Sequence, residues 1–227
     1  MIPIQNIYYM LSYAFQVLNE QGYKNIATEQ FNNTGELMAA ILEKGIAIQL
    51  KRGLGKEYIL QTEALSSLRG KIDIAESIKT QSMLRKQLIC TYDEFSVNSI
   101  MNRIIKSTVE LLLRSNISKQ RKKNLRKLMV YFSEVDFIDL YTVNWNVQYN
   151  RNNQTYHMLI SICYLVVKGL LQTQSNGHTE LMDFLDEQRM CRLYEKFILE
   201  YYRKEFKNQF TANASQIPWQ LDNEENS

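Results

Sequence analysis

The sequence predicts a helix-rich α+β fold with a small antiparallel sheet. The 227 residues include only 2 prolines and 8 glycines, which favours long helices over many tight turns. Apolar residues recur at helical spacing near both ends and in the middle of the chain. Short β-branched and aromatic runs gather between residues 56 and 97. With 45% hydrophobic residues, the chain can fill a sizeable core.

The first predicted helix is uncharged and aromatic, since no charged residue precedes Glu20. A secretory signal would need a basic start, and a transmembrane helix would need about 18 or more consecutive apolar residues. The chain shows neither pattern, so we expect no membrane partner. The spacing instead predicts a helix docked on the core through Ile4, Ile7, Leu11, Phe15 and Leu18.

A second helix and the sheet follow. Thr34 is the expected cap of this helix, and Gly53 is its expected end. The pattern then changes to short runs typical of strands, which we expect at Tyr58 to Thr62, Leu68 to Ile72 and Leu88 to Phe95. These three strands should form the antiparallel sheet.

Helical spacing returns after the strands. Ser99 can cap a helix whose inner face comprises Met101, Ile104, Ile105, Thr108, Leu111 and Leu112. A polar elbow leads to a second helix that ends in apolar residues, Leu125, Leu128, Met129 and Phe132. The two helices should form a pair.

The last third holds one ambiguous segment. Residues 143–150, VNWNVQYN, alternate between apolar and polar, which predicts a half-buried strand, with a loop as the alternative. The run TYHMLISICYLVVKGLL is apolar nearly all round and predicts a central core helix. The connector TQSNGHTE is a candidate boundary, and RLYEKFILEYYRKEF predicts a final helix.

Residues suited to catalysis or metal binding are scarce. The 3 cysteines lie far apart and there are only 2 histidines, which argues against a disulfide framework or a histidine-rich metal site and fits a cytoplasmic protein. RGLGKEY lacks the spacing of a phosphate-binding loop. The acid-x-Lys triplet Glu205 to Lys207 falls in a predicted helix, where residues i and i+2 diverge. We assign no catalytic residue and no metal ligand.

Two charged segments are candidate binding sites. From Arg114 to Lys127 the chain carries seven basic residues and no acid. This basic block could bind phosphates or form an ordinary solvated helix face, and the absence of aromatic residues among the cations favours the solvated face. Its candidate nucleic-acid-binding residues are Lys119, Arg121, Lys122, Lys123, Arg126 and Lys127.

The second candidate is the turn LSSLRGKID at residues 65–73. Gly70, between Arg69 and Lys71, could shape a projecting hairpin tip whose cations meet an acidic partner. An ordinary turn with solvated charges is the alternative, and loop composition alone favours it.

Four segments, in this order, resemble the McrC family, the partner subunits of the McrB GTPase in modification-dependent restriction systems. They are IPIQNIYYMLSYAF, LRGKIDIAESI, YDEFSVNSIMNRIIKSTVELLL and LYEKFILEYYRKEF. The resemblance runs from Ile2 to about Trp219. It implies binding to a hexameric ring of McrB, a GTP-specific AAA+ motor that recognises DNA containing 5-methylcytosine, and stimulation of its GTP hydrolysis.

The resemblance also implies a division of the chain. Residues 1–175 would bind the motor and project a strand-rich finger, about 56–97, into its pore. Residues 176–227 would be the leading helix and first strand of an incomplete PD-(D/E)xK-like nuclease domain. The residues that would engage the ring are Leu68, Arg69, Gly70, Lys71 and Asp73.

The departure from the family lies at the C-terminal end. The family's acidic and D-x-K segments would follow Pro218-Trp219, but this chain ends at Ser227. We therefore expect no cofactor in this chain: the partner would bind GTP, Mg²⁺ would serve only the missing nuclease core, and methylated DNA would be met through the complex. The leading interpretation is an activating module, and the alternatives are a truncated endonuclease subunit and a standalone DNA-binding protein that uses the basic block.

Overall fold

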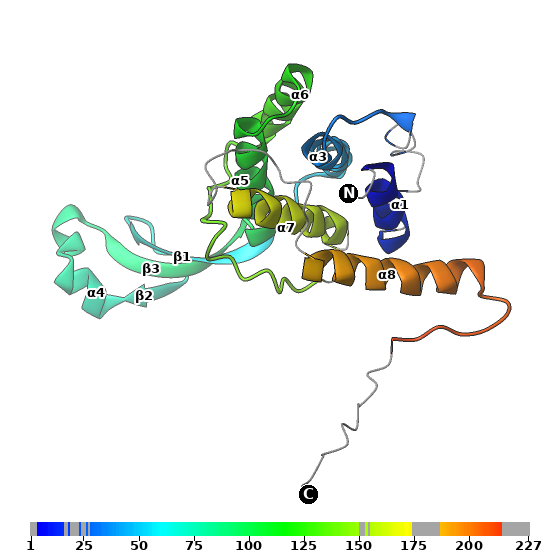
Figure 1. Ribbon diagram of the computed structural model, residues 1–227. Helices are drawn as coiled ribbons and strands as arrows, with labels where there is room; N and C mark the ends of the chain where they lie inside the picture. Colours follow the sequence, from blue (N-terminus) through cyan, green and yellow to red (C-terminus); the bar gives the residue numbers. More distant parts are fainter. Residues whose placement is uncertain are drawn as a thin grey trace, which may run out of the picture.

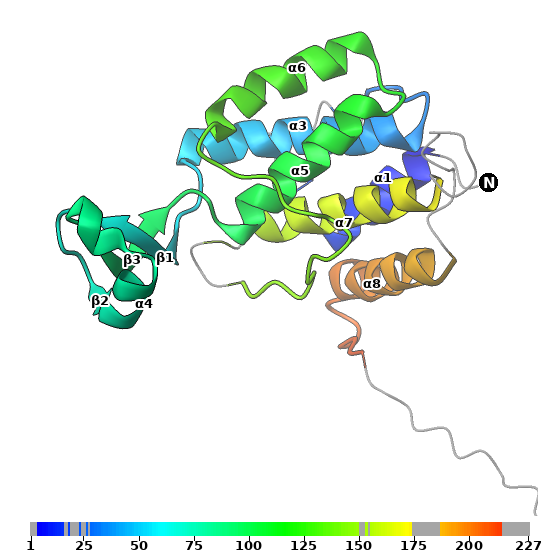
Figure 2. The same ribbon diagram turned by 90° about the vertical axis from the view of Figure 1, so that its left-hand side faces the viewer.

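The structure is a computed structural model that describes residues 4–15, 18, 23, 26, 28–149, 153, 155–173 and 187–214. It consists of a helical body and a small sheet that projects from one end of that body (Figures 1 and 2). We call the projecting part, residues 56–97, the finger. The helix-rich α+β prediction with a small antiparallel sheet is confirmed.

The helical body is built around a buried helix, α7. This helix packs against α3 and α5, while α6 lies on α3 (Figure 2). The α7 side chains Leu159, Ile162 and Cys163 are at most 1% exposed, as expected for the predicted core helix. The helices of the body are α1 (Ile4–Ala14), α3 (Thr34–Arg52), α5 (Ile100–Arg114), α6 (Lys119–Met129), η4 (Val130–Phe132), α7 (Tyr156–Thr173) and α8 (Glu187–Glu205).

The first helix docks on the core as its spacing predicted. Ile7, Leu11, Phe15 and Leu18 are all buried, because they recur on the face that α1 and the residues after it turn inward. None of the described helices is long and apolar enough to cross a membrane.

Helix α8 packs against α1 through aromatic side chains. The rings of Tyr13 and Phe197 lie 5.5 Å apart, and the Tyr13 hydroxyl donates a hydrogen bond to Glu205 Oε1 at 2.9 Å. Glu205, the acid of the acid-x-Lys triplet, therefore has a structural contact at the end of α8. The predicted domain boundary near residue 175 and the segment around Trp219 lie outside the described residues.

The finger contains three antiparallel strands in the order β1-β3-β2. Strand β1 (Glu57–Leu65) pairs along its whole length with β3 (Leu88–Ser96), and the short β2 (Lys71–Asp73) pairs with the other edge of β3. Helix α4 (Ile74–Lys79) and the 3-10 helix η3 (Ser82–Arg85) connect β2 to β3 and form the end of the finger (Figure 1).

Three local predictions need correction. Asn33, rather than Thr34, caps α3, because its side chain accepts the Glu36 amide. The strand expected at Leu68 to Ile72 begins only at Lys71, because the chain turns at Gly70. Residues 143–149 form no strand, so the loop alternative is right: their burial alternates as predicted, but they lie against the core without a pairing strand.

Candidate functional site

The base of the finger is fixed by a buried hydrogen-bond network, which we call the base network. The side-chain Nδ2 of Asn102 donates to the Gly55 carbonyl at 2.9 Å and to the Val97 carbonyl at 2.8 Å. The Tyr156 hydroxyl donates to Asn102 Oδ1 at 2.7 Å and accepts the Gly55 amide at 2.7 Å. Gly55 precedes β1 and Val97 follows β3, so one buried asparagine holds both connections of the finger.

The base network is closely packed as well as fully hydrogen bonded. Asn102 is fully buried and Tyr156 is 1% exposed. A Cβ atom at Gly55 would lie 3.0–3.2 Å from the Tyr156 ring, so glycine allows the backbone to approach the phenol. Buried polar groups that satisfy one another in this way rigidify a structure. The finger is therefore a stiff extension of the helical body.

The turn before β2 requires glycine. Gly70 has φ +67°, a left-handed conformation that is costly for residues with a Cβ atom. An added Cβ would also lie 2.3 Å from the Thr91 carbonyl oxygen on β3. The backbone at Gly70 thus crosses directly over β3, and no other residue fits there without displacing the strand.

The predicted partner-binding residues divide into supporting and exposed groups. Gly70 shapes the turn, and Asp73 caps α4 by accepting the Glu76 amide at 2.9 Å. Leu68, Arg69 and Lys71 are exposed. The Arg69 guanidinium lies 4.1 Å from the Tyr92 ring centroid, which restrains its side chain on the surface of the sheet.

Two buried serines attach the end of the finger to β3. The Ser77 hydroxyl donates to the Asp73 carbonyl at 2.5 Å and accepts the Ile89 amide at 2.8 Å. The Ser82 hydroxyl donates to the Ser77 carbonyl at 3.3 Å. Both serine side chains are fully buried. The short helices α4 and η3 are thereby held against the strand.

The end of the finger exposes large apolar side chains on α4 and η3. Leu84 is 81% exposed, and the others are between 53% and 63% exposed. We call this set, carried by the two short helices α4 and η3, the apolar tip: Ile74, Ile78, Met83 and Leu84. Gln81 and Lys86 on either side of η3 have φ near +53°, a strained backbone conformation for residues other than glycine. Grouped exposed apolar side chains mark interaction surfaces.

The basic block forms α6 and lies on the helical body, away from the finger (Figure 2). Arg121 differs from the other predicted nucleic-acid-binding residues because its side chain turns inward and is only 14% exposed. It contacts Glu43 at 2.9 Å, Glu29 at 2.5 Å and Glu36 at 3.6 Å. Lys119, Lys123, Arg126 and Lys127 are exposed, and Lys122 is half-buried.

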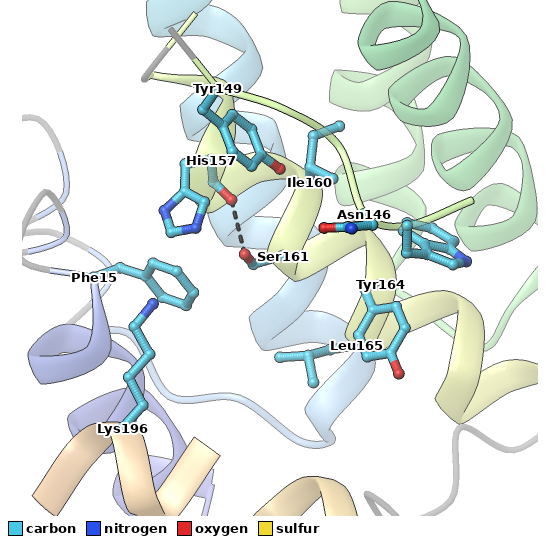
Figure 3. Close-up of a pocket in the computed structure, with 10 residues that line it drawn as sticks. Phe15, Asn146, Tyr149, His157, Ile160, Ser161, Tyr164, Leu165 and Lys196 are labelled. Carbon is cyan, nitrogen blue, oxygen red and sulfur yellow. Dashed lines mark hydrogen bonds between the residues drawn. The ribbon is translucent and has the colours of Figure 1, made fainter. Parts of the chain in front are cut away.

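A cavity of about 460 Å³ lies between α1, α7, α8 and the segment 143–149. Tyr149, His157 and Tyr164 line it, and Lys196 extends from α8 to within 4.1 Å of the Phe15 ring centroid (Figure 3). Burial lowers the pKa of Lys196 and, together with Lys196, that of His157. Burial also raises the pKa of Tyr149 to about 12. Among the described residues, no three His, Cys, Asp or Glu side chains are grouped to hold a metal ion.

Sequence reasoning missed both the base network and the apolar tip. Asn102 and Tyr156 are 54 residues apart, and neither has a local pattern that pairs them. The signal for the tip was present in IDIAESIKTQSMLR, where several large apolar residues stand in a segment too short to bury them. An amphipathic pattern without room for a core is typical of an exposed contact surface.

Known proteins match both the sequence and the fold. Residues 5–226 match the family described as McrBC 5-methylcytosine restriction system component. One curated relative, the type IV methyl-directed restriction enzyme EcoKMcrBC of Escherichia coli (strain K12), is 29% identical over 221 residues. The aligned part is 96% of this chain and 63% of that relative, so this chain spans less than two thirds of its length.

Two solved structures share the fold. The chain matches the Thermococcus gammatolerans McrBC complex with a TM-score of 0.58 and 22% identity over 89% of this chain and 58% of that one. It matches a half-complex of T. gammatolerans McrB AAA+ hexamers with bound McrC with a TM-score of 0.55 and 20% identity, over 86% of this chain and 47% of that one. Since the family match covers nearly every residue, the resemblance seen in the motifs is confirmed, and this chain belongs to the McrBC family of 5-methylcytosine restriction system components.

Proposed function

We propose that this chain is a McrC-like subunit that binds the ring of a McrB-type AAA+ GTPase through its finger and stimulates GTP hydrolysis. The observation that carries the proposal is the apolar tip, held at the end of a sheet that the base network fixes to the helical body. A domain gains no stability from four large apolar side chains exposed to water, so a partner that covers them explains the arrangement.

The family supports the choice of partner. A related fold occurs in the assembly of T. gammatolerans McrB AAA+ hexamers with bound McrC. The E. coli relative is a methyl-directed restriction enzyme. We therefore propose a AAA+ hexamer as the partner and methylated DNA as the substrate of the whole complex.

A stiff finger suits this task for an energetic reason. Binding is weakened by the free energy needed to order mobile groups at an interface, about 0.5–1.5 kcal/mol for each long side chain and more for a loop. The base network and the two buried serines order the finger before it meets the ring. More of the contact energy at the tip is then available for binding.

The proposed stimulation follows from unequal contacts. A single finger in a ring of identical subunits touches some subunit interfaces and not others. It shifts the ring toward the states in which those contacts are strongest, and this differential affinity is the coupling free energy that allostery requires. Residues 1–175 would form the motor-binding domain, and residues 176–227 would lead into the nuclease domain, whose Mg²⁺ and catalytic groups we do not assign to this chain.

The experiment is a GTP turnover and co-elution assay with the purified cognate GTPase. The wild-type chain should co-elute with the ring and increase turnover. Replacing Leu84 with aspartate should raise the concentration needed for half-maximal stimulation about 30-fold, which is the effect of losing a contact worth about 2 kcal/mol.

The matched control is Val130→Asp, which places the same charge at a 72% exposed apolar position on the body. Val130→Asp should stimulate like the wild type. A wild-type chain that neither co-elutes nor stimulates would overturn the proposal, as would equal effects of the two substitutions.

A further inference from the structure

The outer face of α6 presents five basic side chains in one row, which we call the basic stripe. They recur at positions i, i+3, i+4, i+7 and i+8, namely Lys119, Lys122, Lys123, Arg126 and Lys127. At about 100° of rotation per residue, the five positions fall within about 140° of the helix circumference. No acidic residue lies anywhere in α6.

The opposite face of α6 is anchored to α3. Arg121 contacts Glu43 and Glu29, and Asn124 donates to Glu43 Oε1 at 2.9 Å. Burial alone would lower the pKa of Arg121, but its hydrogen bonds and charge interactions with Glu43 and Glu29 outweigh burial and raise it. Arg121 therefore stays charged and holds the helix in a fixed rotation, with the basic stripe outward.

The stripe cations have no acidic partner among the described residues. Arg114, just before the stripe, is paired with Glu110 at 3.2 Å. The ion pairs formed by the described parts of the chain include none of the five stripe residues. Glu43 on α3 is already engaged by Arg121 and Asn124. Within the described parts of the chain, no ion pair neutralises the positive charge of the stripe.

We infer that the basic stripe binds the phosphate backbone of nucleic acid without reading its sequence. This inference rests on the proposed function, because a restriction complex must hold DNA. Contacts to phosphates are electrostatic, so a row of cations can make them without a buried apolar centre in the interface. An acidic protein partner would instead need an aromatic or apolar anchor at the centre of its contact, and the exposed Val130 and Tyr131 lie beyond the end of α6 rather than among the five cations.

The dimensions of the stripe suit a duplex. The nine residues from Lys119 to Lys127 span eight helical steps, a rise of about 12 Å, over which double-stranded DNA carries about seven phosphates. Helix α6 lies on the body at a distance from the finger, in both views of the molecule (Figures 1 and 2). DNA on the stripe would therefore leave the apolar tip free for the ring.

The test uses the full chain and a fluorescein-labelled, unmethylated duplex of about 30 base pairs, with anisotropy measured across a range of NaCl concentrations. The stripe variant carries Lys123→Gln and Lys127→Gln. The control carries Lys51→Gln and Arg52→Gln, two exposed cations in the last turn of α3. Circular dichroism should show that both variants remain folded.

We expect the stripe variant to lower the slope of log K against log [NaCl] by about 1.8 and to weaken binding about 10- to 30-fold near 0.15 M salt. The control should match the wild type. Equal losses in both variants would overturn the inference, as would tighter binding of the wild type to a polyglutamate peptide of equal charge than to the duplex. Neither pair of residues lies on the finger, so the stripe variant should stimulate the GTPase normally. A wild-type chain that binds DNA but does not stimulate the GTPase would contradict only the proposed function.

Discussion

Replacing Tyr156 with phenylalanine tests the base network with the smallest chemical change. The ring that packs against Gly55 is kept, and only the hydroxyl is lost. That hydroxyl makes two hydrogen bonds of 2.7 Å, one accepted from the Gly55 amide and one donated to Asn102 Oδ1. Both partners lose their contact in the variant.

The expected loss of stability can be worked from these contacts. An unsatisfied buried donor or acceptor costs about 1–3 kcal/mol. Asn102 is fully buried and should incur most of this penalty, whereas Gly55 is half-buried and water can partly replace its partner. We expect Tyr156→Phe to lower the free energy of unfolding by about 2–4 kcal/mol, which for a chain of this size lowers the Tm by about 5–15 °C.

The assay is thermal unfolding followed by circular dichroism at neutral pH. Tyr131→Phe is the matched control, because this tyrosine is 67% exposed, and it should change the Tm by less than about 2 °C. In a double-mutant cycle, Tyr156→Phe and Asn102→Ala should destabilise by less than the sum of the single effects, since both remove the same network. A Tm for Tyr156→Phe equal to that of the control, or strictly additive effects, would refute the role assigned to the network.

Three further substitutions test other parts of the structure by the same measurement. Gly70→Ala should destabilise the finger by at least about 1 kcal/mol, because the added Cβ meets β3 at a left-handed position, and amide exchange should rise in β2 if this is correct. Arg121→Met should cost about 2–4 kcal/mol because it leaves clustered carboxylates without their cation, and an unchanged Tm would contradict that. Burial raises the pKa of Cys163 to about 12, whereas the thiol of the unfolded chain has a pKa of about 8.5, so the stability of the protein should fall as the pH rises above about 8.5. Cys163→Val should reduce that fall, and an identical pH dependence in the variant would exclude this role for the thiol.

Local rules predicted much of the fold because they involve neighbouring residues. Ser99 caps α5 as expected, since a serine side chain satisfies the free amides of the first helical turn. Gly53 ends α3, and the apolar run of α7 forms the centre of the core. The two helix ends depend on contacts within a few positions in the sequence, and the burial of α7 follows from its apolar composition.

The wrong predictions came from features that depend on distant partners. Alternation in residues 143–149 correctly gave the burial of Val143, Trp145, Val147 and Tyr149. A strand also needs a neighbouring strand, and none of the strands in the described residues pairs with this segment. Thr34 and Asn33 can both cap a helix, and only the backbone geometry decides between them. Helix α4 was missed because six residues carry too little periodicity.

The predicted partner-binding residues remain a prediction, and the fold assigns them different structural roles. Within the turn LRGKID, Gly70 and Asp73 shape the backbone, and the large apolar side chains beyond them on α4 and η3 are exposed. The basic block likewise looked uniform in the sequence. Only the fold separates Arg121, which faces three carboxylates, from the other five cations, of which four are exposed and Lys122 is half-buried.

Site-specific photocrosslinking tests the central claim most directly, because it reports contact between the finger and the ring. A photoreactive amino acid is placed at position 84 at the end of the finger or, as the control, at position 130 on the body. In the presence of the cognate AAA+ GTPase and nucleotide, we predict crosslinks to the motor subunit from position 84 and none from position 130. Crosslinks from position 130 alone, or from neither position while the proteins co-elute, would contradict the claim that the finger engages the ring.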